Sequence, residues 1–269
     1  MDRSDARKAI VSKLDEMVLL EEVKEHDLVA PYGDRSGVVI EQLLTGQWFV
    51  RAGPLAEPAI KAVEDGEIQF VPKQYENMYF AWMRDLQDWC ISRQRTWGVP
   101  IALFVHKETS EIHPDSQALI EKVALKVEEK GIDAWFELEA QELLSEEDAA
   151  NYVKVIDTLD VWFDSGAMPY AQLHYPFENK EGFDQVYPAD FIAEGVDQTR
   201  GWFFTLHAIA VMLFDSVAYK NIISNGLVLD KTGAKMSKRL GNAVDPFETI
   251  EKHGSDPLRW YMITNAQPW

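Results

Sequence analysis

The chain has 269 residues, of which 46% are hydrophobic and 26% charged, an ordinary composition for a folded globular protein. Intrinsic disorder is therefore excluded. The longest apolar stretch, residues 201–214, is too short to span a bilayer, so we expect no membrane segment. The single cysteine, Cys90, cannot form an internal disulfide or a cysteine-rich zinc site, which indicates a reducing, cytoplasmic setting. Metal-ligand spacing is also missing from His106, His113, His174 and His253, so we expect no protein-bound metal.

The net charge of −19 argues against broad, non-specific attraction to nucleic acid, because phosphate binding needs lysine and arginine. Much of the acidic excess is local. Residues 131–153 contain seven acidic side chains and no lysine or arginine, which favours a solvated acidic face over a partner site. Residues 190–254 are nearly neutral, and four bases are crowded into residues 231–239, where they could meet a phosphate.

Short elements are predicted for the first part of the chain from its apolar spacing and turn residues. They are a helix over 4–18 with Ser4 as its cap, a turn at 31–37, strands at 38–40 and 47–50, and a helix over 58–64 that stops at Gly66.

The middle of the chain alternates between helical and strand patterns. It predicts an aromatic-rich helix over 74–88, a buried strand over 99–105 and a helix over 116–130. Gly131 would end the last of these helices. Its inward face is predicted to carry Ile120, Val123, Ala124 and Val127.

The last third predicts a strand at 191–193, a turn at 194–195, a long apolar helix that ends at Phe214, a strand at 222–223 and a hairpin-like stretch at 226–230. Strand, helix and strand with short connections are typical of a parallel sheet, so the predicted fold class is α/β. Glu194 and Gly195 stand where a strand ends and a helix begins. Parallel α/β sheets place their ligand crevice at this position.

Residues 235–239, Lys-Met-Ser-Lys-Arg, form a basic loop between Gly233 and Gly241. A mobile cationic loop can close over a polyphosphate and stabilise charge that develops during transfer. The loop is not a Walker loop, because no glycine stands four residues before a Gly-Lys-Ser/Thr triplet. By composition alone an ordinary basic surface loop is the better interpretation, and the neighbouring motifs reverse that preference.

The loop resembles the Lys-Met-Ser-Lys-Ser signature of class I aminoacyl-tRNA synthetases, with arginine at position 239 in place of the last serine. Five further strings resemble the isoleucyl branch of that family: WCISRQRTWG (89–98), DTLDVWFDSG (157–166), EGVDQTRGWFF (194–204), SNGLVLD (224–230) and DPLRWYM (256–262). Residues 1 to about 88, with YGDRSGVVIE and FVPKQYENMYFAWM, instead resemble the valyl branch. The chain therefore looks like a mosaic whose second half should set specificity.

The resemblance implies a role for each matched residue. Trp162 and Trp202 would bound a pocket for a branched aliphatic side chain, and Gln198 would lie near the ammonium group of the amino acid. Glu194, Gly195 and Asp197 would contact the ribose and backbone portion of an aminoacyl-adenylate. Lys238 would hold the ATP triphosphate and the leaving pyrophosphate, and Lys235 would support the loop.

Each of these residues also has a purely structural interpretation. Tryptophans at such positions are more often core residues, and Asp197 and Gln198 could cap a helix N-terminus while still binding ligand. Arg93 and Arg95 are interpreted as salt-bridged structural arginines rather than ligands.

The departures from the family pattern are also informative. The His-x-Gly-His sequence expected in the first half of the nucleotide fold is absent, as are the threonine-rich editing segment and its aspartate, the anticodon-binding domain and its cysteine zinc clusters. We therefore expect an internal fragment that contains the second half of a Rossmann-like catalytic domain. Its predicted parts are 1–50, the end of the editing insertion with a β-ribbon connection; 51–189, a mixed connective region; 190–254, the nucleotide-binding half; and 255–269, the start of a helical stem-contact region.

The activity implied by the resemblance has two steps. Isoleucine attacks the α-phosphate of ATP, with Mg²⁺ accompanying the nucleotide, and the acyl group then passes to the terminal ribose of tRNA(Ile). No covalent enzyme intermediate is needed, and the fragment alone should be incompetent. A monomer is expected for the full-length family. The alternatives are a valine–tRNA ligase and a non-catalytic remnant or mosaic that keeps the fold.

Overall fold

The computed structural model describes residues 2–33, 36–237 and 241–265. The chain divides into two compact units, Met1–Gly46 and Gln47–Trp269. Within the described residues, no helix is both long and apolar enough to cross a membrane.

The first unit contains one helix, α1 (Arg3–Glu16), which buries none of its side chains. Its cap is Asp2 rather than the predicted Ser4, because the extended backbone of Asp2 lets its carboxylate accept the amide hydrogen of Ser4 at 2.8 Å. The strand predicted at 38–40 is reduced to one bridge between Tyr32 and Val39. A single bridge leaves this segment without the continuous pairing that a strand requires.

The second unit is built around a three-stranded parallel sheet, which confirms the predicted α/β class. Its strands are β2 (Gln69–Val71), β8 (Ile192–Gly195) and β9 (Asn221–Asn225), arranged in the order β2-β9-β8. Ile222 pairs in register with Phe70 on one side and Ile192 on the other. All three side chains are buried, so the centre of the sheet is apolar on its packed face.

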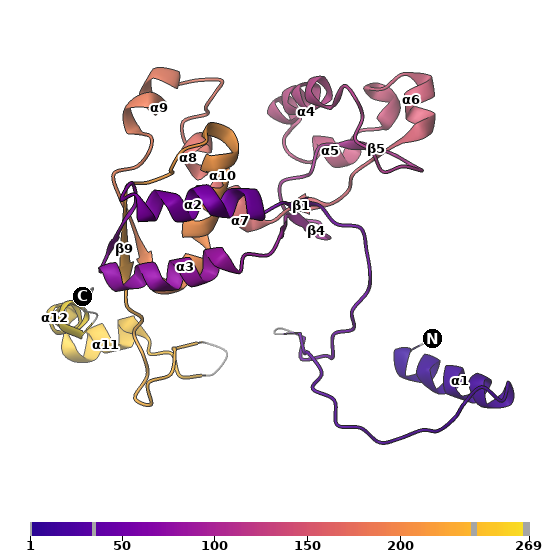
Figure 1. Cartoon of the computed structure of the whole chain (residues 1–269), viewed down its shortest axis with the longest axis horizontal. Coiled ribbons are helices and arrows are strands. Elements are labelled where there is room, and N and C mark those ends of the chain that lie inside the picture. Colours follow the sequence, from indigo (N-terminus) through magenta and orange to yellow (C-terminus); the bar gives the residue numbers. More distant parts are fainter. Residues whose placement is uncertain (1, 34–35, 238–240, 266–269) are drawn as a thin grey trace. The chain divides into compact units, whose positions relative to one another are not determined.

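Three helices pack around this sheet: α2 (Gly53–Glu64), α3 (Glu76–Arg84) and α10 (Trp202–Phe214). Figure 1 shows α2 and α3 running side by side, and the hydroxyl of Tyr79 on α3 donates to the carbonyl of Ala59 on α2 at 3.1 Å. Tyr79 belongs to the main core with Phe203, Tyr219 and Ile222. Helix α10 is buried along most of its length, which explains why its sequence is apolar all round.

Two helix boundaries differ from the predictions. Helix α2 begins at Gly53, five residues before the predicted start, because proline is well tolerated in a first turn and Pro54 stands there. The helix predicted over 74–88 is a 3₁₀ turn, η1 (Lys73–Tyr75), followed by α3, which ends at Arg84. The residues after Arg84 leave the helix and lead into β3 (Trp89–Cys90).

A lobe within the second unit has its own core. It contains β5 (Phe104–His106) paired antiparallel with β6 (Tyr152–Lys154), and the helical elements α4 (Ser116–Lys130), α5 (Ala134–Glu137), η2 (Ala140–Glu142) and α6 (Glu146–Asn151). Phe104, Leu119, Val123 and Trp135 pack together in its centre. Its acidic residues lie mainly outside this core.

Helix α4 has the predicted bounds, and Gly131 ends it with a left-handed φ of 85°. Its inward face was only partly predicted. Leu119 and Val123 are buried, whereas Ile120 and Ala124 are exposed, because apolar residues at adjacent positions leave two choices of face. The strand predicted at 99–105 is also corrected: Pro100 makes one bridge to Thr158, and regular pairing starts only at Phe104.

Short antiparallel pairs connect this lobe to the sheet. Strand β1 (Phe49–Val50), within the predicted 47–50, pairs with β3, and β4 (Ser92–Arg93) pairs with β7 (Thr158–Leu159). Helices α7 (Val161–Gly166), α8 (Met168–Ala171) and α9 (Lys180–Val186) follow β7. After β9 the chain forms a loop with one bridge, Leu229 to Lys235, and then α11 (Pro246–His253) and α12 (Ser255–Asn265).

Candidate functional site

The sequence-predicted residues gather at the carboxyl end of the parallel sheet. Strand β8 ends with Glu194 and Gly195, which pair in register with Ser224 and Asn225 of β9. The 3₁₀ turn η3 (Val196–Arg200) follows and carries Asp197 and Gln198. In open parallel sheets, ligands bind outside the carboxyl ends of the strands. The structure therefore has polar groups at the position where this architecture accepts a ligand.

Gly195 is required by the packing at the strand end. A Cβ added there would lie 2.8 Å from Oδ1 of Asp197 and 3.5 Å from Cδ2 of Leu227. A side chain would therefore displace the Asp197 carboxylate. Glu194 is exposed, and its carboxylate has no hydrogen bond or ion pair within the described part of the chain. It is a free acceptor beside the strand end.

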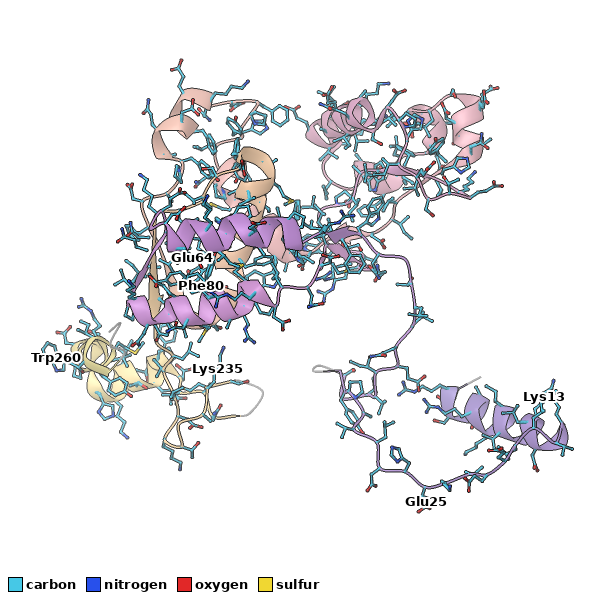
Figure 2. All side chains as sticks on the ribbon, viewed as in Figure 1. Lys13, Glu25, Glu64, Phe80, Lys235 and Trp260 are labelled. Carbon is cyan, nitrogen blue, oxygen red and sulfur yellow. The ribbon has the colours of Figure 1, made fainter. Side chains whose placement is uncertain are left out.

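Asp197 connects this strand end to the basic loop. The Nζ atom of Lys235 lies 3.0 Å from Oδ2 of Asp197, and both side chains are partly exposed. Figure 2 shows Lys235 on the loop that follows β9. Predictions for Lys238 and Arg239 fall outside the described residues.

Asp230 and Asn242 hold the two ends of this loop, here called the lysine loop (residues 230–242). One Asp230 oxygen accepts from the amides of Thr232 and Ala234 and from the Thr232 hydroxyl, while the other accepts from Nδ2 of Asn242 at 2.8 Å. These hydrogen bonds hold the pKa of Asp230 well below its ordinary value. Asn242 also accepts the amide hydrogen of Ser237 at 2.8 Å.

Neither Asp230 nor Asn242 was predicted as a site residue. Asp230 could have been suspected, because aspartate often accepts backbone amide hydrogens two residues ahead in a turn. No local pattern indicated the contact between Asp230 and Asn242, which lie 12 residues apart.

Trp162, Gln198 and Trp202, here called the amino-acid group, surround Gly201. A Cβ added at Gly201 would lie 2.7 Å from Oε1 of Gln198 and 3.2 Å from Cη2 of Trp162. The same Gln198 oxygen accepts the backbone amide hydrogen of Trp202 at 3.0 Å, so Gln198 holds the start of α10. The alternative capping role is therefore present, and a carbonyl oxygen keeps a second lone pair for a ligand.

The two tryptophans are on helices that are fixed to each other. Nε1 of Trp202 donates to the carbonyl of Ser165 on α7 at 3.0 Å. A Cβ added at Gly166 would lie 2.9 Å from both the carbonyl oxygen of Thr205 and Cδ1 of Ile209, so α7 and α10 are in close contact. Trp162 remains 41% exposed, and its indole is therefore available to a ligand.

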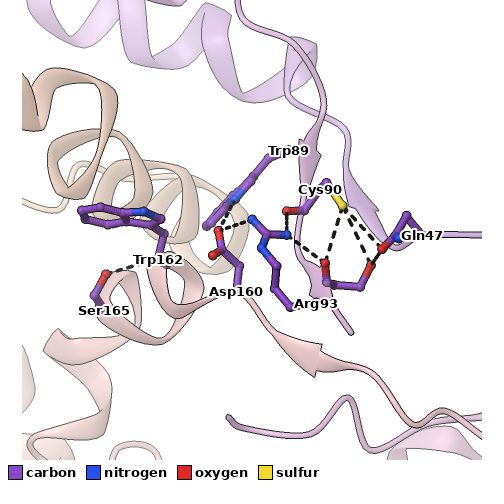
Figure 3. Close-up of polar contacts among 8 residues, drawn as sticks. Gln47, Trp89, Cys90, Arg93, Asp160, Trp162 and Ser165 are labelled. Carbon is purple, nitrogen blue, oxygen red and sulfur yellow. Dashed lines mark hydrogen bonds and ion pairs between the residues drawn. The ribbon is translucent and has the colours of Figure 1, made fainter. Parts of the chain in front are cut away.

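Asp160 anchors the start of α7 from the opposite side. Its buried carboxylate accepts from Nε1 of Trp89 at 3.0 Å and forms an ion pair with Arg93 at 3.1 Å (Figure 3). The predicted structural role of Arg93 is confirmed by this ion pair. Asp160 and Trp89 were not singled out in the sequence. Partial burial and the neighbouring Asp160 together raise the pKa of Asp164.

Comparison with known proteins identifies the family of the fold. A model of the family described as tRNA synthetases class I (I, L, M and V) matches residues 9–268. The isoleucine–tRNA ligase of Bacteroides fragilis is 48% identical over 254 residues, covering 82% of this chain. That of Cytophaga hutchinsonii is 54% identical over 197 residues, covering 70% of this chain. The chain spans only 22% and 18% of the lengths of these two relatives.

A solved structure supports the fold independently. Methionyl-tRNA synthetase of Mycobacterium tuberculosis, in complex with methionyl-adenylate, matches 87% of this chain and 36% of its own chain with a TM-score of 0.55. Its sequence is only 20% identical, so the likeness concerns the fold alone.

Proposed function

Because the chain belongs to the class I aminoacyl-tRNA synthetases of the isoleucine, leucine, methionine and valine group, we propose that it is part of an isoleucine–tRNA ligase. The observation that carries this proposal is the identity of about half of the aligned residues to isoleucine–tRNA ligases. The reaction is ATP-dependent formation of isoleucyl-adenylate and transfer of the acyl group to tRNA(Ile).

Isoleucine is preferred over the valine alternative for a specific reason. The 82% of the chain that aligns with the Bacteroides fragilis enzyme exceeds what residues 89–269 alone could supply. The alignment therefore extends into the part whose motifs resemble the valyl branch. A non-catalytic remnant is favoured only by the missing His-x-Gly-His sequence.

The amino-acid group is proposed to bind isoleucine. The exposed indole of Trp162 and the ring of Trp202 would provide flat apolar walls for the branched side chain. The second lone pair of the Gln198 oxygen would accept from the isoleucine ammonium group. Asp160 and Ser165 would act indirectly, because their contacts position α7 and α10.

Glu194, Gly195 and Asp197 are proposed to bind the ribose and backbone portion of the adenylate. The unpaired Glu194 carboxylate can accept ribose hydroxyl hydrogens, and Gly195 allows the nucleotide to approach the backbone. Asp197 would exchange its contact with Lys235 for a ligand contact when the loop closes. Lys238 would stabilise the charge that builds on pyrophosphate as it leaves.

Mg²⁺ is proposed to accompany ATP and to neutralise charge on its phosphates. No group of three or more suitable side chains is placed to hold a metal ion within residues 2–33, 36–237 and 241–265. The phosphates and water would therefore supply most of its ligands. The complete enzyme is proposed to be a cytoplasmic monomer.

The test is isoleucine-dependent ATP–pyrophosphate exchange, measured for this chain and for the complete protein that contains it. The complete protein should catalyse exchange, whereas this chain alone should be slower by about 100-fold or more, because part of the phosphate site is missing. No exchange by the complete protein with any of the four amino acids would support the non-catalytic remnant. Comparable exchange by the chain alone would contradict the division of the site.

Calorimetry with a non-hydrolysable isoleucyl-adenylate analogue tests the residue roles separately. This chain should bind the analogue weakly. The double variant Glu194→Ala and Lys238→Ala should abolish measurable binding, with Glu121→Ala on the outer lobe as the exposed control. Unchanged affinity in the double variant would remove both residues from the site.

A further inference from the structure

A second cavity lies on the other side of α10 from the amino-acid group's residues, and nothing in the proposed reaction uses it. Its volume is about 480 Å³. Helix α2 supplies one wall with Pro54, Glu57 and Lys61, and the residues that follow α10 supply another with Asp215 and Ser216. His207 of α10 lines the cavity between these walls.

His207 is the unusual group of this cavity. Its side chain is only 2% exposed, and neither Nδ1 nor Nε2 has a hydrogen-bond partner in the described part of the chain. Burial lowers its pKa to about 4, so the imidazole is neutral at physiological pH. A neutral imidazole has one nitrogen that donates and one that accepts. Leaving both unsatisfied in the interior is unfavourable, so a ligand that supplies a partner would gain from this site.

The rim of the cavity is acidic. Glu57, Asp65, Glu67 and Asp215 contribute four carboxylates against the single ammonium group of Lys61. None of these five groups has an ion-pair partner within the residues that the structure describes. The potential at the mouth therefore favours a cation and opposes an anionic ligand.

We propose that this cavity binds a guanidinium group, which donates to the unpartnered imidazole of His207 and is held at the mouth by the acidic rim. A guanidinium is planar and carries five donors, so it can serve a ring nitrogen and a carboxylate together. An ammonium group is more strongly hydrated and loses more on entering a buried site. The covered ring nitrogens also require a flat, slender head group that can reach past the cavity wall.

Two sources can supply this group. One is an arginine side chain of a polypeptide, such as the part of the complete protein that lies outside this chain. The other is a free guanidino compound of low molecular weight. The chemistry at His207 is the same for both, and the two sources differ in whether the cavity is already filled in the complete protein.

The experiment follows the ring nitrogens of His207 by ¹⁵N NMR while agmatine is added, first to this chain and then to the complete protein. Butylamine, which has the same four-carbon stem with an ammonium head, is the matched ligand control. In this chain agmatine should shift the accepting nitrogen of His207, and butylamine should not. The absence of a shift with agmatine, or an equal shift with both compounds, would overturn the proposal.

Variants test the two halves of the site. His207→Phe keeps an aromatic ring and removes the acceptor, so agmatine binding followed by calorimetry should be lost. Because that change is in the core, the exposed double variant Glu57→Gln and Asp215→Asn provides a second test. It should weaken agmatine binding about two- to twentyfold, since each exposed ion pair contributes modestly. The control Glu121→Gln should leave it unchanged, and equal affinity in all variants would overturn the assignment.

The complete protein distinguishes the sources. If agmatine shifts His207 in this chain but not in the complete protein, an arginine of the polypeptide occupies the cavity. If it shifts His207 in both, the ligand is a free guanidino compound. Binding in neither would leave the cavity to water and overturn the proposal.

Discussion

The amino-acid group and the lysine loop differ in how the fold holds their side chains. Trp162 and Trp202 are on two helices in close contact, with Trp202 bonded to Ser165 and α7 anchored through the buried Asp160. The described part of the lysine loop is held instead by exposed polar contacts, from Asp230, Asn242 and the pair of Lys235 with Asp197.

This difference corresponds to two chemical tasks. Discrimination between aliphatic side chains depends on a pocket of fixed shape, which packed helices provide. Stabilisation of a leaving pyrophosphate requires charge that comes into position during the reaction. Exposed hydrogen bonds and ion pairs are individually weak, so they can be exchanged for ligand contacts at small cost. The predictions below test this division.

The largest effect is expected from Lys238→Ala in the complete protein. Adenylate formation should slow by about 100- to 1000-fold, because the ammonium group would stabilise charge that is greatest in the transition state. Single-turnover adenylate formation at saturating ATP measures this, with the exposed Lys231→Ala as the control from the same loop. A rise in KM alone would reduce Lys238 to a ground-state contact and weaken the comparison.

A smaller effect is expected from the pocket. In the complete protein, isoleucine should be preferred over valine by about 10- to 200-fold in kcat/KM for activation, the contribution of one methylene in an apolar pocket. Activation kinetics with both amino acids measure the ratio. A preference for valine would support the valyl alternative and assign specificity to residues other than Trp162 and Trp202.

The packing of α7 on α10 can be tested with Gly166→Ala. The added Cβ would lie 2.9 Å from the Thr205 carbonyl, so the free energy of unfolding should fall by about 1–3 kcal/mol. Urea denaturation of this chain measures the change. Gly182→Ala on α9 is the control, because a Cβ there meets nothing within 4 Å. Equal stability of the two variants would mean that α7 and α10 separate easily.

The smallest effect concerns the ionisation of Asp230. Its hydrogen bonds favour the carboxylate and lower its folded pKa, so its contribution is present above the unfolded value and is lost only as pH falls through the lower folded value. The amide NMR signals of Thr232 and Ala234 should therefore stay constant down to about pH 4 and move at lower pH. In Asp230→Asn these acid-induced movements should disappear. Movement between pH 5 and 4 in the unsubstituted chain would contradict this anchor.

Local sequence patterns determined the elements whose signals are contained within one segment. Helix α4 has the predicted bounds because a capped amphipathic run ends at a glycine with positive φ. The strand–helix–strand pattern also predicted the parallel pairing of β8 with β9 and the position of Glu194 at a strand end. Periodicity is set by residues three or four positions apart, so a single segment is sufficient to reveal it.

Only the tertiary structure decided which distant groups meet. Motif resemblance nominated Trp162 and Gln198, but their approach around Gly201 results from the packing of α7 on α10. The Asp160 contacts with Trp89 and Arg93, the Asp197 contact with Lys235 and the unpartnered His207 also join or isolate residues far apart in the chain. Such contacts depend on how helices and strands pack against one another, and packing leaves no periodic signal in the sequence.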